Sequence, residues 1–164
     1  MGTGAFSRSS AARTVTVEIA TDDGAYLRLT PGSGAGDEFV TAGPDGVVSI
    51  DVGVVDNGTG SQGQGVNPGS VTALRDVLAI ENRGTETVTV SQEPANAGVA
   101  LFDTYNGPES MTLLQNPAGM PTVGVGASVE VGLVVDTGYD PDSVPGELTG
   151  STANVGLTVV ADAE

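Results

Sequence analysis

The stretch SVTALRDVLAIENRGTETVTVSQE (Ser70–Glu93) carries the clearest structural pattern in the sequence. Leu74, Val77 and Leu78 have the spacing of a helix face, but no amphipathic helix of useful length fits before the Asn-Arg-Gly of the next turn. The pattern therefore favours a strand over Val71–Glu81. After a turn, Thr87–Val90 alternates polar and apolar residues, and we expect it to return as the hairpin partner of that strand.

Similar alternating segments recur on both sides of this stretch, each bounded by Gly, Pro, Asp or Asn residues that favour turns. Valine dominates their apolar positions, and β-branched side chains suit a pleated strand. We expect a hairpin turn at Asp22-Asp23-Gly24 and irregular loops at 56–69 and 136–150. The further strands are expected at Arg13–Ala20, Ala25–Thr30, Glu38–Thr41, Val47–Val55, Val99–Thr104, Met111–Gln115, Ser128–Val135 and Val155–Val160.

About ten strands and no convincing helix predict an all-β chain folded as an antiparallel β-sandwich, of jelly-roll or immunoglobulin-like topology. At 164 residues the chain fits one domain. We assign residues 13–164 to that domain and residues 1–12 to an extended N-terminal segment. Tyr26 and Phe102 lie in strand patterns and are expected in the core, whereas Phe6 belongs to no strand of the domain.

The charge balance is strongly acidic. The chain has 21 Asp and Glu residues against five arginines and no lysine, for a formal net charge of −16. Such a surface repels phosphate backbones, so nucleic acid is not an expected partner. Salt at 1 M shortens the screening length to about 3 Å and would relieve the self-repulsion of this chain. The composition therefore favours a halophilic protein over an acidic secreted protein of a mesophile.

Several residue types that carry chemistry are missing. Without histidine, cysteine or lysine, the chain lacks the usual neutral-pH base, the thiolate nucleophile and the Schiff-base amine. A pair of carboxylates acting on a glycoside remains formally possible. We expect a protein that is not an enzyme and that needs no cofactor. No apolar run reaches the ~18 residues that a membrane span needs, so no span is expected in the mature chain.

Two loops contain candidate binding or modification sites. Asp136, Asp140 and Asp142 are close enough in sequence for one curled loop to direct several oxygens at Ca²⁺. An acidic turn exposed to water explains the same residues without a metal. Asn57 begins the sequon Asn-Gly-Thr within the long loop 56–69, where glycosylation is possible if the protein is secreted.

Three segments carry a family resemblance: the start GTGAF, the strand RTVTVEIA followed by an acidic turn and AYLRL, and LRDVLAIENRGTETVTV. Together they resemble haloarchaeal secreted proteins and, more distantly, the TasA and camelysin family and archaeal bundling pili. The resemblance covers Gly2–Leu29 and Val71–Val90. The small residues before Phe6 are similar to a signal-peptide junction, so we expect a mature, exported chain to which a start methionine has been added.

This resemblance implies a cell-surface jelly-roll subunit that polymerises with identical subunits into an extracellular filament. Residues 2–10 would leave their own domain and complete the sheet of the next subunit, with Phe6 as the main anchor. The polymerisation residues implied in this way are Gly2, Thr3, Gly4, Ala5, Phe6 and Ser7. A monomeric cell-surface module that binds calcium or glycans, with a flexible N-terminal tether, is the alternative that the sequence leaves open.

Overall fold

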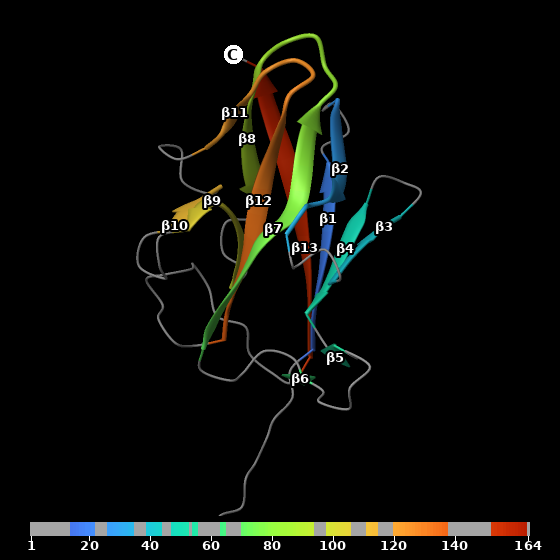
Figure 1. Cartoon of the computed structure of the whole chain (residues 1–164), viewed down its shortest axis with the longest axis vertical. Helices are drawn as coiled ribbons and strands as arrows, with labels where there is room; N and C mark the ends of the chain where they lie inside the picture. The colour runs from blue at the N-terminus through green and yellow to red at the C-terminus, as the bar shows by residue number, and fades with distance from the viewer. Residues whose placement is uncertain are drawn as a thin grey trace, which may run out of the picture.

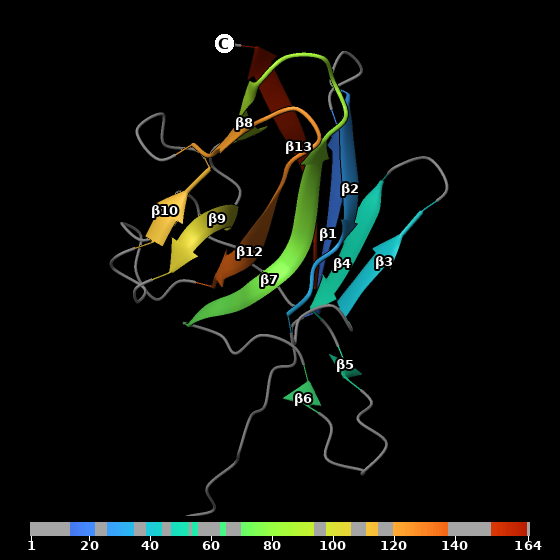
Figure 2. The same ribbon diagram turned by 45° about the horizontal axis from the view of Figure 1, so that its top comes forward.

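The computed structural model describes residues 14–21, 26–34, 39–43, 47–52, 54–55, 63–64, 70–93, 98–105, 111–114, 120–137 and 152–163. Every regular element in these ranges is a β-strand, and the strands form two large sheets and one small ribbon (Figure 1). Figure 2 shows the two large sheets facing one another. The predicted all-β sandwich is therefore confirmed.

The two large sheets divide the strands unequally. The six-stranded sheet has the order β11 (Thr122–Val123), β8 (Val88–Glu93), β13 (Thr152–Ala163), β1 (Thr14–Thr21), β4 (Val48–Val52) and β3 (Val40–Ala42). The five-stranded sheet has the order β10 (Met111–Leu113), β9 (Val99–Tyr105), β12 (Ser128–Asp136), β7 (Val71–Asn82) and β2 (Leu27–Pro31). The ribbon pairs β5 (Val54–Val55) with β6 (Gly63–Gln64).

Strands β1 and β13 are the one parallel pair among the described strands. Thr14 lies opposite Thr152, and Thr21 lies opposite Val159. Both strands run toward the same end of the sandwich, where β13 finishes at Ala163 (Figure 1). The chain therefore enters β1 at the end of the sandwich where β13 begins, which we call the entry end. The end that holds Ala163 is called the exit end.

The main core fills the space between the two sheets. Alternate residues of each strand point into it, as the period of two requires. Strand β13, for example, contributes Leu157 and Val159, and β12 contributes Val131, Leu133 and Val135. The other fully buried members come from β2, β4, β7, β8, β9 and β11 and from the residue after β10: Leu29, Val48, Ile50, Val52, Val77, Leu78, Ile80, Val90, Val99, Leu101, Leu114 and Val123.

A β-bulge explains the helix-like spacing in β7. Leu74 pairs with Leu133 and Leu78 pairs with Val131, so the three residues between them on β7 lie opposite a single residue of β12. Asp76 within this bulge has a φ of 50°, a left-handed conformation that aspartate tolerates better than most residues. Because the bulge interrupts the alternation, the neighbouring residues Val77 and Leu78 are both buried in the core, against which Leu74 also packs. The predicted strand at 71–81 is confirmed.

Both predicted hairpins are wrong. Strands β7 and β8 belong to different sheets, and so do β1 and β2. The link at 83–87 instead crosses from one sheet to the other, a gap of about 10 Å that five residues can span. Strand β6 lies in the segment 56–69 that was predicted to be irregular, and β11 was not predicted at all.

One side of the sandwich is closed by hydrogen bonds between the sheets. Gln92 of β8 is buried, and its Oε1 accepts a hydrogen bond of 2.6 Å from the main-chain N–H of Leu101 in β9. The main chain of Leu114 donates to the Leu101 carbonyl and accepts from the Gln92 N–H. Leu114 thus joins β8 to β9 on this side of the sandwich.

The opposite side ends in the edge strands β2 and β3. The Tyr26 carbonyl accepts from the Arg83 N–H, and the Gly32 N–H donates to the Val77 carbonyl. In an antiparallel pair this alternation turns the main-chain groups of Leu27 and Leu29 away from β7. Among the described residues, no strand pairs with that outer edge of β2, and in this sense we call it the free edge.

Phe102 is buried as predicted, but it packs on the outer face of the five-stranded sheet rather than in the main core. With Ala100 and Val134 it forms a second apolar cluster. Its ring lies over Gly132, the residue opposite it on β12. The prediction that Tyr26 lies in the core is wrong, since the residue precedes β2 and is 77% exposed. Leu27 and Leu29 take the inward positions instead.

Gly132→Ala should destabilise the fold. A Cβ at this position would collide with the Phe102 ring and the Leu74 carbonyl oxygen, and overpacking of this kind costs about 1–3 kcal/mol or more. Gly156→Ala on β13 is the matched control, because nothing lies within 4 Å of its Cβ position. The control should keep or slightly raise the free energy of unfolding. Urea unfolding in molar NaCl measures both, and equal stability of the two variants would contradict the packing described.

Candidate functional site

Most of the predicted site residues lie outside the described residues. This holds for the polymerisation segment from Gly2 to Ser7, for Asn57, and for Asp140 and Asp142. Their roles stay predictions. In the part of the chain that the structure describes, no group of three or more acidic side chains gathers in a way that could hold a metal ion.

Asp136 is the one predicted calcium ligand that the structure places, and it does not lie in an exposed loop. It is the last residue of β12 and is only 1% exposed. Its main-chain N–H donates to the Gly98 carbonyl, and the next residue, Thr137, exchanges hydrogen bonds with Ser70. Asp136 is thus part of the sheet, because strand pairing continues one residue beyond the predicted end of that strand.

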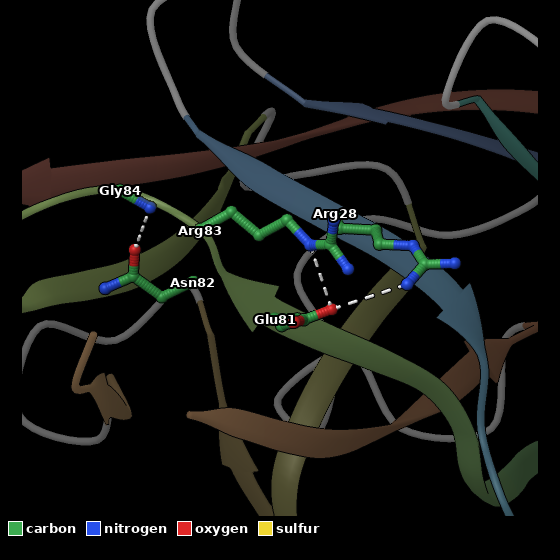
Figure 3. A network of polar contacts seen from close by, with 5 residues as sticks. All are labelled: Arg28, Glu81, Asn82, Arg83 and Gly84. Atoms are coloured by element: carbon green, nitrogen blue, oxygen red, sulfur yellow. Dashed lines mark hydrogen bonds and ion pairs between the residues drawn. The ribbon is translucent and has the colours of Figure 1, made fainter. Parts of the chain in front are cut away.

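The turn that leaves β7 is organised by Asn82, which is 1% exposed. Its side-chain Nδ2 donates hydrogen bonds of 2.8 Å to the Glu86 carbonyl and 2.9 Å to the Val123 carbonyl. Its Oδ1 accepts a bond of 2.8 Å from the Gly84 N–H (Figure 3). One amide therefore holds the start and end of the turn and the neighbouring strand β11.

The main chain of Asn82 ties the same turn to the loop between β11 and β12. Its N–H donates to the Ala127 carbonyl, and its carbonyl accepts from the Gly126 N–H. Gly126 has a φ of 73°, a left-handed conformation that glycine adopts without strain. Both loops lie at the exit end of the sandwich, and Asn82 fixes one against the other.

A pocket of about 200 Å³ opens beside this turn, between the two sheets at the exit end. Residues of the turn form one wall, and Tyr26 and Leu27 at the start of β2 form another. Val88, Ala161 and Ala163 complete the lining from the six-stranded sheet. Small-molecule sites are usually 300–1,000 Å³, so this volume suits one or two side chains better than a cofactor.

The pocket exists because the inward residues of β13 become smaller toward its end. Val155, Leu157 and Val159 fill the core in turn. The next residues with the same alternation are Ala161 and Ala163, which lie opposite Val90 and Val88 of β8. Alanine at these two positions leaves unfilled the space that a larger residue would occupy.

Two of the five arginines gather on the outer face next to the pocket. Arg28 on β2 and Arg83 in the turn both approach Glu81 on β7, at 3.7 and 3.3 Å (Figure 3). The arginine side chains are about half exposed, and exposed pairs of this kind add less than about 1 kcal/mol to stability. These three side chains together carry one net positive charge, and the acidic Glu86 of the same turn lies in the lining of the pocket.

The sequence contains signals for these features, although sequence reasoning missed the pocket. The Asn-Arg-Gly of ENRGT was correctly taken as a turn, but burial of the asparagine side chain has no pattern of its own. The fall from leucine and valine to alanine along 155–163 is visible in the printed sequence. Only the packing of β13 beside β8 and opposite β2 shows that these smaller side chains leave a pocket.

No family model and no curated protein matches this chain. The family resemblance drawn from the sequence therefore stays a prediction. Within the described residues, no helix has the length and apolar character needed to cross a membrane.

Asn82→Ala should lower the free energy of unfolding by about 2–4 kcal/mol, because it removes three hydrogen bonds and leaves buried main-chain groups without partners. Thr85→Ala in the same turn is exposed and should change stability by less than about 0.5 kcal/mol. Urea unfolding in molar NaCl compares the two variants. A cost below 1 kcal/mol for Asn82→Ala would contradict its role as organiser of the exit end.

Proposed function

We propose that this chain is a structural subunit of an extracellular, cell-surface filament of a halophilic archaeon. Identical subunits join head-to-tail, and the N-terminal segment of one completes the next. This is the filament that the sequence resemblance implies, and no enzymatic role or cofactor belongs to the proposal.

The observation that carries the proposal is the parallel pairing of β1 with β13. It sets Thr14, the first described residue of β1, at the entry end, whereas the pocket and the start of the free β2 edge lie at the exit end. A donor at one end and an acceptor at the other let each subunit contact a different neighbour at each end. When such a head-to-tail contact does not close into a reciprocal dimer or a ring, it repeats from subunit to subunit and builds an open fibre.

The free edge of β2 supports the same proposal. An edge strand exposes main-chain N–H and C=O groups that an added strand can pair. The free edge is short, because Leu27 and Leu29 supply its N–H groups and Pro31 has none to donate. An edge of this length can pair with only a few residues of the segment 2–10.

The distribution of charge also favours contact between copies. Residues 1–13 contain Arg8 and Arg13 and no acidic residue, so all 21 acidic residues lie in the rest of the chain. A basic N-terminal segment and an acidic body attract each other between subunits. Molar salt screens this attraction over about 3 Å, so burial of apolar surface must supply most of the stability there.

Deleting residues 2–10 should abolish assembly and leave the sandwich folded. We expect the full chain in molar NaCl to form filaments by electron microscopy, and the deletion variant to run as a monomer in size-exclusion chromatography. The far-ultraviolet circular dichroism of the two proteins should agree.

A full-length variant with residues 2–10 in shuffled order is the matched control, since it keeps the length and charge of the segment. It should also fail to assemble. Filaments from the deletion or shuffled variant would rule out strand donation by this segment, and a full chain that stays monomeric would rule out the filament.

A further inference from the structure

We propose that the pocket at the exit end is the acceptor for the Phe6 side chain of a second copy of this chain. This inference rests on the proposed filament and adds the identity of its acceptor site. The residues that would receive Phe6 are Leu27, Val88, Ala161 and Ala163, with Tyr26 at the rim.

The Phe6 of the same chain is poorly placed to fill this pocket. Eight residue steps lead from Phe6 to Thr14, and a fully extended chain of that length spans about 26–29 Å. Thr14 lies level with Thr152, and the nine steps from Thr152 to Ala161 extend about 30 Å along β13. The segment would have to reverse its direction before β1 and stay fully extended along the sandwich to bring its ring to the pocket. A second molecule can present the segment without this reversal.

The lining of the pocket suits an aromatic ring. Leu27 and Val88 both pack against the main core, and the two alanines of β13 leave room above it. Tyr26, 77% exposed, offers an aromatic face at the rim that a second ring can contact. Among residues 2–10 Phe6 is the one large apolar side chain, and its neighbours in GTGAFS are small enough to let the main chain approach closely.

The pocket also continues into the free edge of β2, because Leu27 belongs to both. The main-chain groups of Leu27 point away from β7, and its side chain helps to line the pocket. A strand paired with this edge would have every second side chain directed toward the sandwich. Phe6 in the pocket would thus set the register of the donated strand.

A peptide titration tests the pocket separately from filament formation. The receptor is the full-length Phe6→Ala variant, which keeps its pocket but cannot donate Phe6. The probe is a synthetic peptide of residues 2–10, measured by isothermal calorimetry in molar NaCl. We expect saturable binding with one peptide per chain, weakened at least about tenfold by Phe6→Ala in the peptide.

Filling the pocket should remove this binding. Ala161→Leu in the same receptor should weaken it at least about tenfold, because the leucine takes the space of the ring. Ala163→Leu, nearer the open mouth, is a second variant in case the first does not fold. Ala42→Leu is the matched control, since Ala42 lies exposed on β3 away from the pocket and should leave the affinity unchanged. Circular dichroism checks that each receptor is folded.

The outcomes separate this inference from the filament itself. Absence of peptide binding, or equal affinity in folded pocket-filled and control receptors, overturns the pocket assignment even if the wild-type chain forms filaments. Binding that depends on Phe6 and on an open pocket upholds the assignment. If the wild-type chain forms only closed dimers in which Phe6 occupies this pocket, the filament proposal fails while the assignment of the pocket stands. If the wild-type chain stays monomeric at concentrations that saturate the receptor with peptide, both proposals fail.

Discussion

The parallel hydrogen bonding between β1 and β13 sets the polarity of the whole molecule. Eight residues of β1 pair in register with β13, from Thr14 opposite Thr152 to Thr21 opposite Val159. An antiparallel arrangement would bring the N-terminal segment to the end that holds Ala163. The parallel one keeps Thr14, where the N-terminal segment joins β1, at the end opposite the pocket, and this geometry is compatible with a head-to-tail contact.

The exit end depends on a second constraint, the burial of Asn82. Its amide and main chain hold the turn after β7 against β11 and the loop before β12. The turn in this way forms a fixed wall for the pocket, whose depth comes from Ala161 and Ala163. Because this wall is already ordered, less conformational entropy is lost when a segment binds in the pocket. The sandwich thus presents a preformed hollow at one end.

The alternation of polar and apolar residues within each segment was enough to predict the strands and the fold class, because the side chains of a strand repeat with a period of two. It was not enough to predict which strands share a sheet. The length of the link at 83–87 is compatible with a hairpin in one sheet or with a connection between the two sheets. In the structure it connects the two sheets, and the buried side chain of Asn82 donates a hydrogen bond to β11 of the other sheet. The spacing of Leu74, Val77 and Leu78 was ambiguous for a related reason, since the bulge at Asp76 places three residues with helical spacing at the same core.

The candidate site was harder to predict than the fold. Asp136 follows a valine-rich run and precedes a Gly- and Pro-rich segment, so its place at the end of the strand depended on pairing with Val71, far away in the sequence. The pocket depended on small residues of β13 facing β8 and β2, which alternation along one strand does not reveal. The N-terminal segment, by contrast, stood out in sequence, because it has a lone phenylalanine among small residues.

The direction of β1 can be measured directly, since the chain has no cysteine and accepts labels at chosen positions. Spin labels at Thr14→Cys and Asp162→Cys report the distance between the entry end and the exit end by pulsed electron resonance. We expect a Phe6→Ala background to keep the protein monomeric for this measurement. Parallel pairing predicts a distance of about 33 Å, from the ten residues between Thr152 and Asp162. A distance below about 20 Å would mean that β1 runs the other way, and the polarity proposed for assembly would be wrong.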